Sequence, residues 1–353
     1  MAAAVEPAEG PTAPPSGRAL AFASASTLCF LAAAALIITL VGRAHNPAIT
    51  LDLPAPPHMV RPSVPITAPT ATDTSSVGPV TKPLYAGKAL LADPALIENT
   101  AIGPLPRIAD DGRKPMTAYG GAVPVNGKFR IAIVVNGLGL SASATRTALE
   151  SLPAGVTLGF APYASDVSQW VGQARSHGHE VLLEIPMEPF DFPDSDPGPH
   201  TLRAGQDDNA NTQRLNWALT RFTGYAGVTN LLGQRFLSDS DALAPALSML
   251  NRRGLYFFDN GAAAQSVTPT VAGQVGIPLV QSGPAIDTIQ TALEIDRHLF
   301  ELETQARANG SAVGSAFLYP VSIARIAAWA RGLQSRGFVL VPVSAIVSAP
   351  KKE

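Results

Sequence analysis

Carboxyl side chains interrupt or follow short apolar runs in the second half of the chain. Glu184 lies inside the run VLLEIPM, Glu188 comes directly after it, and Asp259 follows the run LYFF. If Glu184 faces an apolar interior, burial raises the pKa of its carboxyl group, which suits it to general acid catalysis near neutral pH. Glu188 and Asp259 are candidates because they follow predicted strands. We therefore take Glu184, Glu188 and Asp259 as candidate catalytic residues. Structural alternatives stay open, with Glu184 facing a polar loop, Glu188 as a solvated charge and Asp259 as a helix cap.

Further polar and aromatic side chains stand at the ends of similar runs and could hold a substrate. Amide and phenol groups hydrogen-bond hydroxyl groups, and sugar rings stack on aromatic faces. The candidate substrate-binding residues are Asn136, Tyr163, Asp191, Asn230, Phe317 and Tyr319. Aromatic residues in these positions also serve for packing alone, so that alternative stays open.

Metal-ligating residues are sparse. The chain has a single cysteine, Cys29, and none of its six histidines follows one of the strands predicted below. A hydrolytic zinc site needs about three protein ligands and an open position for water, so we expect no metal centre. Two carboxylate-based alternatives stay open: a calcium or magnesium site from Glu188, Asp191 and Asp259, and glycoside hydrolysis by Glu188 and Asp259.

Charge and glycine patterns exclude other partners. The 25 basic and 27 acidic residues nearly balance, so we expect no nucleic acid to bind. Gly137-Leu138-Gly139 lacks the third glycine and the acidic ribose partner of a dinucleotide site. We therefore expect no cofactor.

Short β-branched runs alternate with helical patterns from Lys128 onward. The expected strands cover residues 130–135, 156–161, 181–186, 227–230, 255–258, 278–281, 311–316 and 338–343. The expected helices cover residues 141–151, 166–176, 242–253, 288–308 and 321–335, with Asp287 as the cap of the fourth. This alternation predicts an α/β fold, a distorted (β/α) barrel of seven to eight strands, with a doubly wound open sheet as the alternative. In such barrels the chemistry lies at the carboxyl ends of the strands.

The first third of the chain has a different composition. Residues 19–42 contain no charged residue and are long enough to cross a membrane; we expect an uncleaved transmembrane helix after a short tail of residues 1–18. Residues 43–127 are rich in Pro, Ala and Thr and should form a linker, whose second half could dock on the folded domain. The domain itself should span residues 128–349.

Several segments of that domain resemble the divergent polysaccharide deacetylases. The resemblance rests on VVNGLGLS, GHEVLLEIPMEP, TLR, GVTNLLG, LYFFDN and NGSAVGSAFLYP, in this order between residues 134 and 320. These relatives are envelope proteins of Gram-negative bacteria with a distorted (β/α) barrel, related to metal-dependent glycan de-N-acetylases. The resemblance implies a periplasmic domain with a groove for a glycan.

The chain departs from that family's pattern where metal and base are expected. Asn136-Gly137 stands where less altered relatives have an aspartate pair, and Leu231 where they have a histidine. The resemblance places further family histidines at Glu184, Phe317 and Tyr319. Asparagine lacks a basic carboxylate and leucine cannot bind a cation.

We therefore expect a domain that binds envelope glycan and has lost metal-dependent deacetylation, held to the inner membrane by one helix with the barrel in the periplasm. Two alternatives stay open. The first is an active hydrolase built on Glu184, Glu188, Asp191 and Asp259, and the second is an envelope interaction protein that binds no carbohydrate. The protein partner, if there is one, is unknown.

Overall fold

The computed structural model describes residues 92–124 and 128–347, which fall within the unit Ser76–Glu353. The expected tail, membrane helix and first part of the linker, residues 1–91, lie outside the described residues. Among those described, no helix is long and apolar enough to cross a membrane. The predicted domain boundaries stay predictions.

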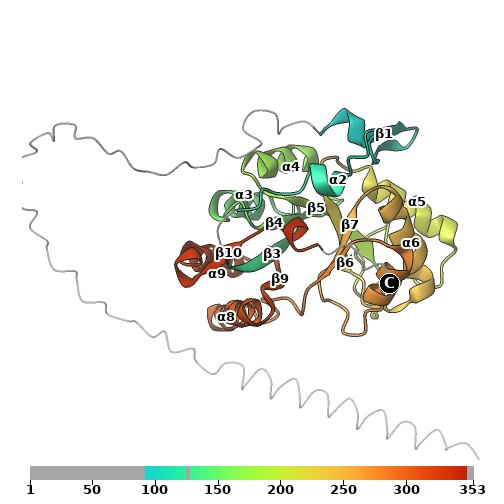
Figure 1. The fold of residues 1–353 in the computed structure, drawn as a ribbon. Helices are drawn as coiled ribbons and strands as arrows, with labels where there is room; N and C mark the ends of the chain where they lie inside the picture. The colour runs from blue at the N-terminus through green and yellow to red at the C-terminus, as the bar shows by residue number, and fades with distance from the viewer. Residues whose placement is uncertain (1–91, 125–127, 348–353) are drawn as a thin grey trace, which may run out of the picture. The chain divides into compact units, whose positions relative to one another are not determined.

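Eight strands, each parallel to its neighbours, form the central sheet (Figure 1). They are β3 (Phe129–Leu138), β4 (Thr157–Phe160), β5 (Val181–Met187), β6 (Gly227–Leu232), β7 (Tyr256–Asp259), β8 (Leu279–Gln281), β9 (Ser311–Phe317) and β10 (Phe338–Leu340). The sheet runs from β3 through β4, β5, β6 and β7 to β8, while β9 pairs with the opposite edge of β3. This nearly closed parallel sheet, with helices around it, confirms the predicted distorted (β/α) barrel.

The barrel stays open at one place, between β8 and β9, which do not pair with each other in the described chain. We call this gap the seam. Hydrogen bonds from the described residues of β9 and the chain after β8 cross this side of the barrel: Ile286 N donates to Ser315 O (2.8 Å), Ser315 Oγ to Asn260 O (2.8 Å) and Phe317 N to Asp287 Oδ2 (2.8 Å). Within the described chain the seam therefore lacks the continuous strand pairing that joins the other neighbouring strands.

Alternation along the strands separates two apolar clusters. In β3, Ile131, Ile133 and Val135 pack outward with the helices, whereas the smaller Ala132 and Val134 point into the barrel. The inner cluster also contains Leu182, Tyr256, Phe258 and Val280. Side chains therefore fill the barrel interior up to the level of Val134.

Seven helices of eight or more residues lie in the described chain, and five of them were predicted. They are α3 (Ala142–Ser151), α4 (Val167–Ser176), α5 (Asp208–Leu219), α6 (Ser240–Arg252), α7 (Thr268–Val275), α8 (Ala292–Asn309) and α9 (Pro320–Arg331). Helices α5 and α7 were missed because the buried apolar residues of α5 fall only in its second half, and because α7 is short and rich in β-branched residues. The predicted cap Asp287 was wrong: Thr291 caps α8 by accepting a hydrogen bond from Glu294 N.

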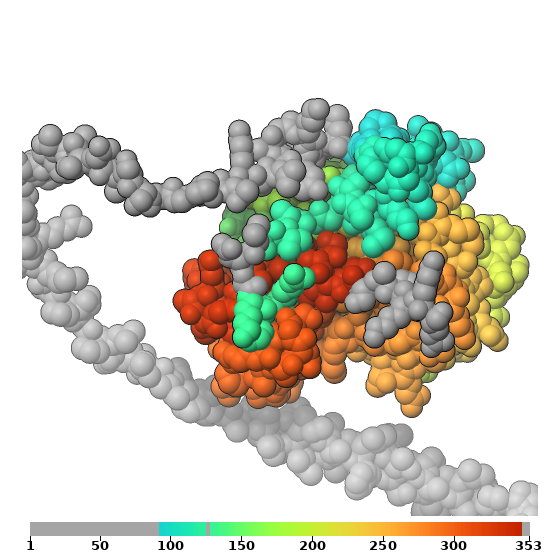
Figure 2. Space-filling view, in the orientation of Figure 1, coloured from blue at the N-terminus to red at the C-terminus, as the bar shows by residue number. Residues whose placement is uncertain are grey.

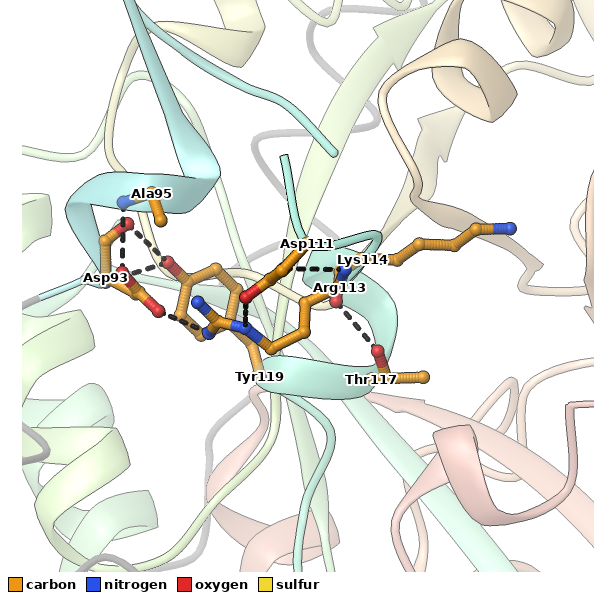
Figure 3. A network of polar contacts seen from close by, with 7 residues as sticks. All are labelled: Asp93, Ala95, Asp111, Arg113, Lys114, Thr117 and Tyr119. Carbon is orange, nitrogen blue, oxygen red and sulfur yellow. Dashed lines mark hydrogen bonds and ion pairs between the residues drawn. The ribbon is translucent and has the colours of Figure 1, made fainter. Parts of the chain in front are cut away.

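Residues 92–124, from the second half of the predicted linker, form ordered elements. These are η1 (Pro94–Leu96), the antiparallel hairpin β1 (Ile97–Thr100) and β2 (Gly103–Pro106), and α2 (Pro115–Ala118). Figure 3 shows the polar network that joins the start and the end of this segment. Asp93 accepts hydrogen bonds from Ala95 N (2.9 Å) and Arg113 Nη1 (2.5 Å), and Asp93 N donates to the Tyr119 hydroxyl (3.0 Å).

This segment lies at the amino-terminal ends of the strands, where Met116 N donates to Gly254 O (3.1 Å) just before β7. In Figure 2 its surface adjoins that of the last described residues of the chain. Leu96, Ala109 and Tyr119 belong to the inner apolar cluster. The buried Glu180 carboxylate links residues 92–124 to the C-terminal part of the domain, because it accepts hydrogen bonds from Gly121 N (2.9 Å) and Ser344 N (3.1 Å). It also accepts them from the hydroxyls of Tyr256 (2.8 Å) and Thr157 (3.2 Å). A ligand site is therefore expected at the opposite end of the barrel, where the carboxyl ends of the strands lie.

Candidate functional site

A pocket of about 510 Å³ opens at the carboxyl ends of β7, β8 and β9, beside the seam. We call it the mouth pocket. Its polar side chains are Gln234, Asn260, Gln281, Ser282 and Thr288, its aromatic one is Phe317, and the remaining lining residues are Gly, Ala, Pro and Leu. No lining residue is charged. Gln234 Oε1 and Ser282 Oγ are buried and have no hydrogen-bond partner within the described residues.

Asn260 is fixed in the pocket wall by a reciprocal amide pair with Asn230. Asn230 Nδ2 donates to Asn260 Oδ1 (2.8 Å), while Asn260 N donates to Asn230 Oδ1 (3.0 Å) and Asn260 Nδ2 to Asn230 O (2.9 Å). Asn230 Nδ2 also donates to Leu232 O (2.7 Å), and Leu232 has the left-handed φ of 58°. Asn230, a predicted substrate-binding residue, is thus buried and positions Asn260. Asn260 and Leu232 line the pocket.

Asp259 lies behind the same wall. Its side chain is fully buried and accepts hydrogen bonds from Ser266 Oγ (2.7 Å), Gln281 Nε2 (3.2 Å) and Gly261 N (3.1 Å). The candidate catalytic carboxylate therefore does not line the pocket. It orients the amide of Gln281, which does.

Glu184 and Asn136 meet in the barrel interior, below the mouth. Glu184 is completely buried, and one of its carboxyl oxygens accepts a hydrogen bond from Gly137 N. Burial raises the pKa of Glu184 to about 8, against the smaller opposing effect of that hydrogen bond. A Cβ atom on Gly159 would stand 2.5 Å from Asn136 Oδ1 and 3.1 Å from Glu184 Oε1, so only glycine fits there. Neither residue lines the mouth pocket.

Glu188 is buried and engaged elsewhere. Only 5% of it is exposed, and its carboxylate accepts hydrogen bonds from Ala204 N (2.7 Å) and Arg235 Nη1 (3.1 Å). The carboxylate joins the loop after β5 to the loops around residues 204 and 235, so the alternative of a solvated rim charge was wrong. Asp191 is exposed and accepts a hydrogen bond from Ser195 Oγ (2.6 Å).

The predicted aromatic residues separate into two groups. Phe317 lines the mouth pocket, and its ring centroid lies 6.2 Å from that of Tyr319. Tyr163 lies elsewhere: its ring contacts Trp217 at 5.1 Å, and its hydroxyl accepts a hydrogen bond from His200 N (3.1 Å). Of the nine predicted site residues, Phe317 alone lines the pocket.

The residues at the barrel mouth do not fit the metal that the resemblance implies. Within residues 92–124 and 128–347, no three His, Cys, Asp or Glu side chains gather where they could hold an ion. The enclosed pair has a single carboxyl group, on Glu184, beside the amide of Asn136, and the apolar Leu231 supplies no ligand.

Sequence reasoning missed most of the pocket lining. Asn260 and Gln281 do carry a detectable signal, since each stands at the carboxyl end of a predicted strand. Gln234 and Ser282 lie in loops after β6 and β8, and only the fold brings them together. A further buried carboxyl was overlooked: Asp287 accepts hydrogen bonds from Phe317 N (2.8 Å) and Ser322 Oγ (2.6 Å).

A parallel barrel with a pocket at the carboxyl ends of its strands defines a class of fold in which ligands bind at that mouth. The model of the divergent polysaccharide deacetylase family matches residues 133–347, and the chain belongs to this family.

Two sequence relatives and one solved structure are similar to the chain. It is 22% identical over 220 residues to the uncharacterized protein YibQ of Escherichia coli (strain K12), covering 62% of this chain and 66% of the relative. It is 24% identical over 207 residues to an uncharacterized protein of Haemophilus influenzae, covering 58% of this chain and 72% of that relative. The crystal structure of the uncharacterized protein ATU2773 from Agrobacterium tumefaciens C58 is 42% identical, with a TM-score of 0.68, covering 69% of this chain and 100% of that one.

Proposed function

We propose that this domain binds a neutral stretch of envelope glycan in the mouth pocket and does not deacetylate it by a metal-dependent route. The observation that carries the proposal is the pocket lining, which combines amide and hydroxyl groups with one aromatic ring and contains no charged residue. Sugar hydroxyl and acetamido groups are neutral donors and acceptors, and their rings pack against aromatic faces. Membership of the family supports a glycan as the ligand.

The carboxylates support binding over turnover. Glu188 and Asp259 are held by internal hydrogen bonds, and Glu184 is enclosed below the mouth. A general acid must reach within hydrogen-bond distance of the group that it protonates. None of these carboxyl groups lines the pocket in which we place the ligand.

We also propose that residues 19–42 cross the inner membrane once and that the barrel lies in the periplasm. Two features support this placement: the uncharged stretch of 24 residues and the envelope location that the resemblance implies.

Retention of the purified full-length chain on insoluble peptidoglycan, together with calorimetry against chitooligosaccharides, tests the binding. Phe317→Ala and Gln234→Ala should weaken retention by about fivefold or more, because each removes a pocket group. The matched controls are Phe300→Ala and Gln213→Ala, which change exposed residues outside the pocket. Failure of both glycans to bind, or equal losses in the controls, contradicts the proposal and favours the interaction protein without carbohydrate.

One observation favours the alternative of a residual hydrolase: the pKa of Glu184, raised to about 8, keeps this carboxyl group protonated at neutral pH. Acetate release from the same glycans separates the two functions. If the native chain released acetate and Glu184→Gln did not, the hydrolase would be established and a purely binding role would be overturned.

A further inference from the structure

A second pocket, of about 250 Å³, lies away from the barrel mouth. It is formed by the β1–β2 hairpin, α5 and the C-terminal end of α6, which lie beside one another in Figure 1. Its polar lining consists of Glu98, Arg107, Asn216, Arg252 and Arg253. We call it the arginine pocket. It shares no lining residue with the mouth pocket.

The arginine pocket has an excess of positive charge, because its lining contains three arginines and a single carboxylate residue, Glu98. Arg253 Nη1 donates to Glu98 Oε2 (3.0 Å) and to Pro106 O (2.9 Å). Arg107 pairs with Asp110, which lies outside the lining and is 96% exposed. Arg252 donates to Ser248 Oγ (2.7 Å) and pairs with no carboxylate of the described chain.

Each of the three guanidinium groups has N–H donors with no acceptor in the described part of the chain. Within the described residues, Nη1 of Arg107 and Nη2 of both Arg252 and Arg253 have no acceptor. Arg253 is held in place, with only 19% of its side chain exposed. Planar guanidinium groups with free N–H pairs match the oxygen geometry of phosphate and carboxylate groups.

The positions of Arg252 and Arg253 have a second explanation, since cations at the C-terminus of a helix are favoured by the helix dipole. That explanation does not extend to Arg107, which follows the hairpin strand β2 and reaches the pocket from another part of the chain. Glu98 and Asp110 offset two of these three positive charges, which leaves one positive charge for a bound anion to offset.

We propose that the arginine pocket binds a small oxyanion of the phosphate class, either free or as the headgroup of an anionic lipid. The anion accepts hydrogen bonds from Arg107 and Arg252, while Arg253 supplies a fixed positive charge. Binding joins the hairpin to α5 and α6, so the anion also stabilises the docking of residues 92–124 on the barrel.

Calorimetry of the full-length chain with sodium pyrophosphate, against sodium chloride at equal ionic strength, tests the free anion. We expect saturable binding that Arg107→Ala and Arg252→Ala each weaken by about tenfold or more, since each removes a charge-assisted hydrogen bond. Arg331→Ala is the matched control, because Arg331 is also an exposed arginine at the last position of a helix, α9. Its binding should equal that of the native chain.

Vesicle sedimentation distinguishes the lipid source. Phosphatidylglycerol vesicles are compared with phosphatidylcholine vesicles, using the same variants. Loss of binding in the Arg107 and Arg252 variants with either probe supports the site. Absence of binding to both probes, or equal weakening by Arg331→Ala, overturns it. Neither result depends on the mouth pocket, so glycan binding is tested separately.

Discussion

Asn136 Oδ1 and Glu184 Oε1 lie on either side of the space left by the missing side chain of Gly159. Within the described chain, Asn136 Oδ1 and the second carboxyl oxygen of Glu184, Oε2, have no hydrogen-bond donor. Buried acceptor atoms without a donor are unfavourable. Protonation of Glu184 reduces this cost, because the carboxyl group then carries no charge, in agreement with its raised pKa.

Glu184 should make the protein less stable as the pH rises. Its pKa is about 8 in the folded state and near the ordinary 4.5 when unfolded, so the folded state binds more protons between these values. The free energy of unfolding therefore falls from about pH 4.5 to about pH 8, by the order of 3 kcal/mol at pH 7. Glu184→Gln should remove this slope in denaturant titrations at several pH values. A variant that keeps the slope would show that Glu184 ionises normally.

Asn260→Ala should destabilise the domain by about 1 to 3 kcal/mol, because it leaves Asn230 O and Ala262 N without their partners. It should also weaken glycan retention, since Asn260 itself lines the mouth pocket. Asn209→Ala, at an exposed site on α5, is the control. Chemical denaturation measures the first effect and retention on peptidoglycan the second. Unchanged stability would mean that the amide pair contributes little.

His179→Ala should lower stability by about 1 to 3 kcal/mol without changing glycan binding. His179 is buried at the amino end of β5, and its Nδ1 lies 2.9 Å from Val156 O. Burial lowers its pKa to about 4, so the folded state resists protonation, and stability is lost as the pH falls from about 6.5 to about 4. The control His177→Ala changes an exposed neighbour. If the variant lost glycan binding but kept normal stability, the glycan would bind at the amino end of the barrel and not at the mouth pocket.

A chain beginning at Ala92 should fold cooperatively, whereas one beginning at Lys128 should be much less stable. The shorter chain removes Leu96, Ala109 and Tyr119 from the inner cluster and the Gly121 donor from Glu180. Loss of buried apolar surface and of a bond to a buried carboxylate both destabilise. Thermal melts followed by circular dichroism compare the two. Equal melting temperatures would show that residues 92–124 dock without contributing to stability.

Chelator should leave the melting temperature of the domain unchanged. Binding of a metal to the folded state alone would raise the melting temperature by an amount that grows with the logarithm of its affinity, and we expect no such ion here. Melts with and without EDTA, followed by addition of zinc or calcium, provide the check. A drop of several degrees that zinc reverses would reveal a metal site.

The strands could be predicted because β-branched runs bounded by turns are local in sequence, and β5 and β7 stand where the pattern places them. The fate of each site residue depends on contacts that no local pattern carries. Glu188 is neutralised by Arg235, 47 residues later, and Gln281 receives its orientation from Asp259. The strand-end rule therefore points to the end of the barrel at which the mouth pocket lies, but of the nine candidate residues Phe317 alone lines that pocket.

The seam between β8 and β9 affects how the domain could select ligands by size. A fully paired barrel has a fixed circumference, because widening it breaks a row of backbone hydrogen bonds. Here β8 and β9 share no row of backbone hydrogen bonds, and the described residues near the gap are linked instead by bonds of Ser315 to Ile286 and Asn260 and by the bond from Phe317 N to Asp287. Since the mouth pocket opens beside this gap, its width is set by the chain that follows β8, including Ser282 and Thr288. In related proteins, insertions or deletions in the segment after β8 would change the size of ligand that the pocket accepts while leaving the barrel unchanged.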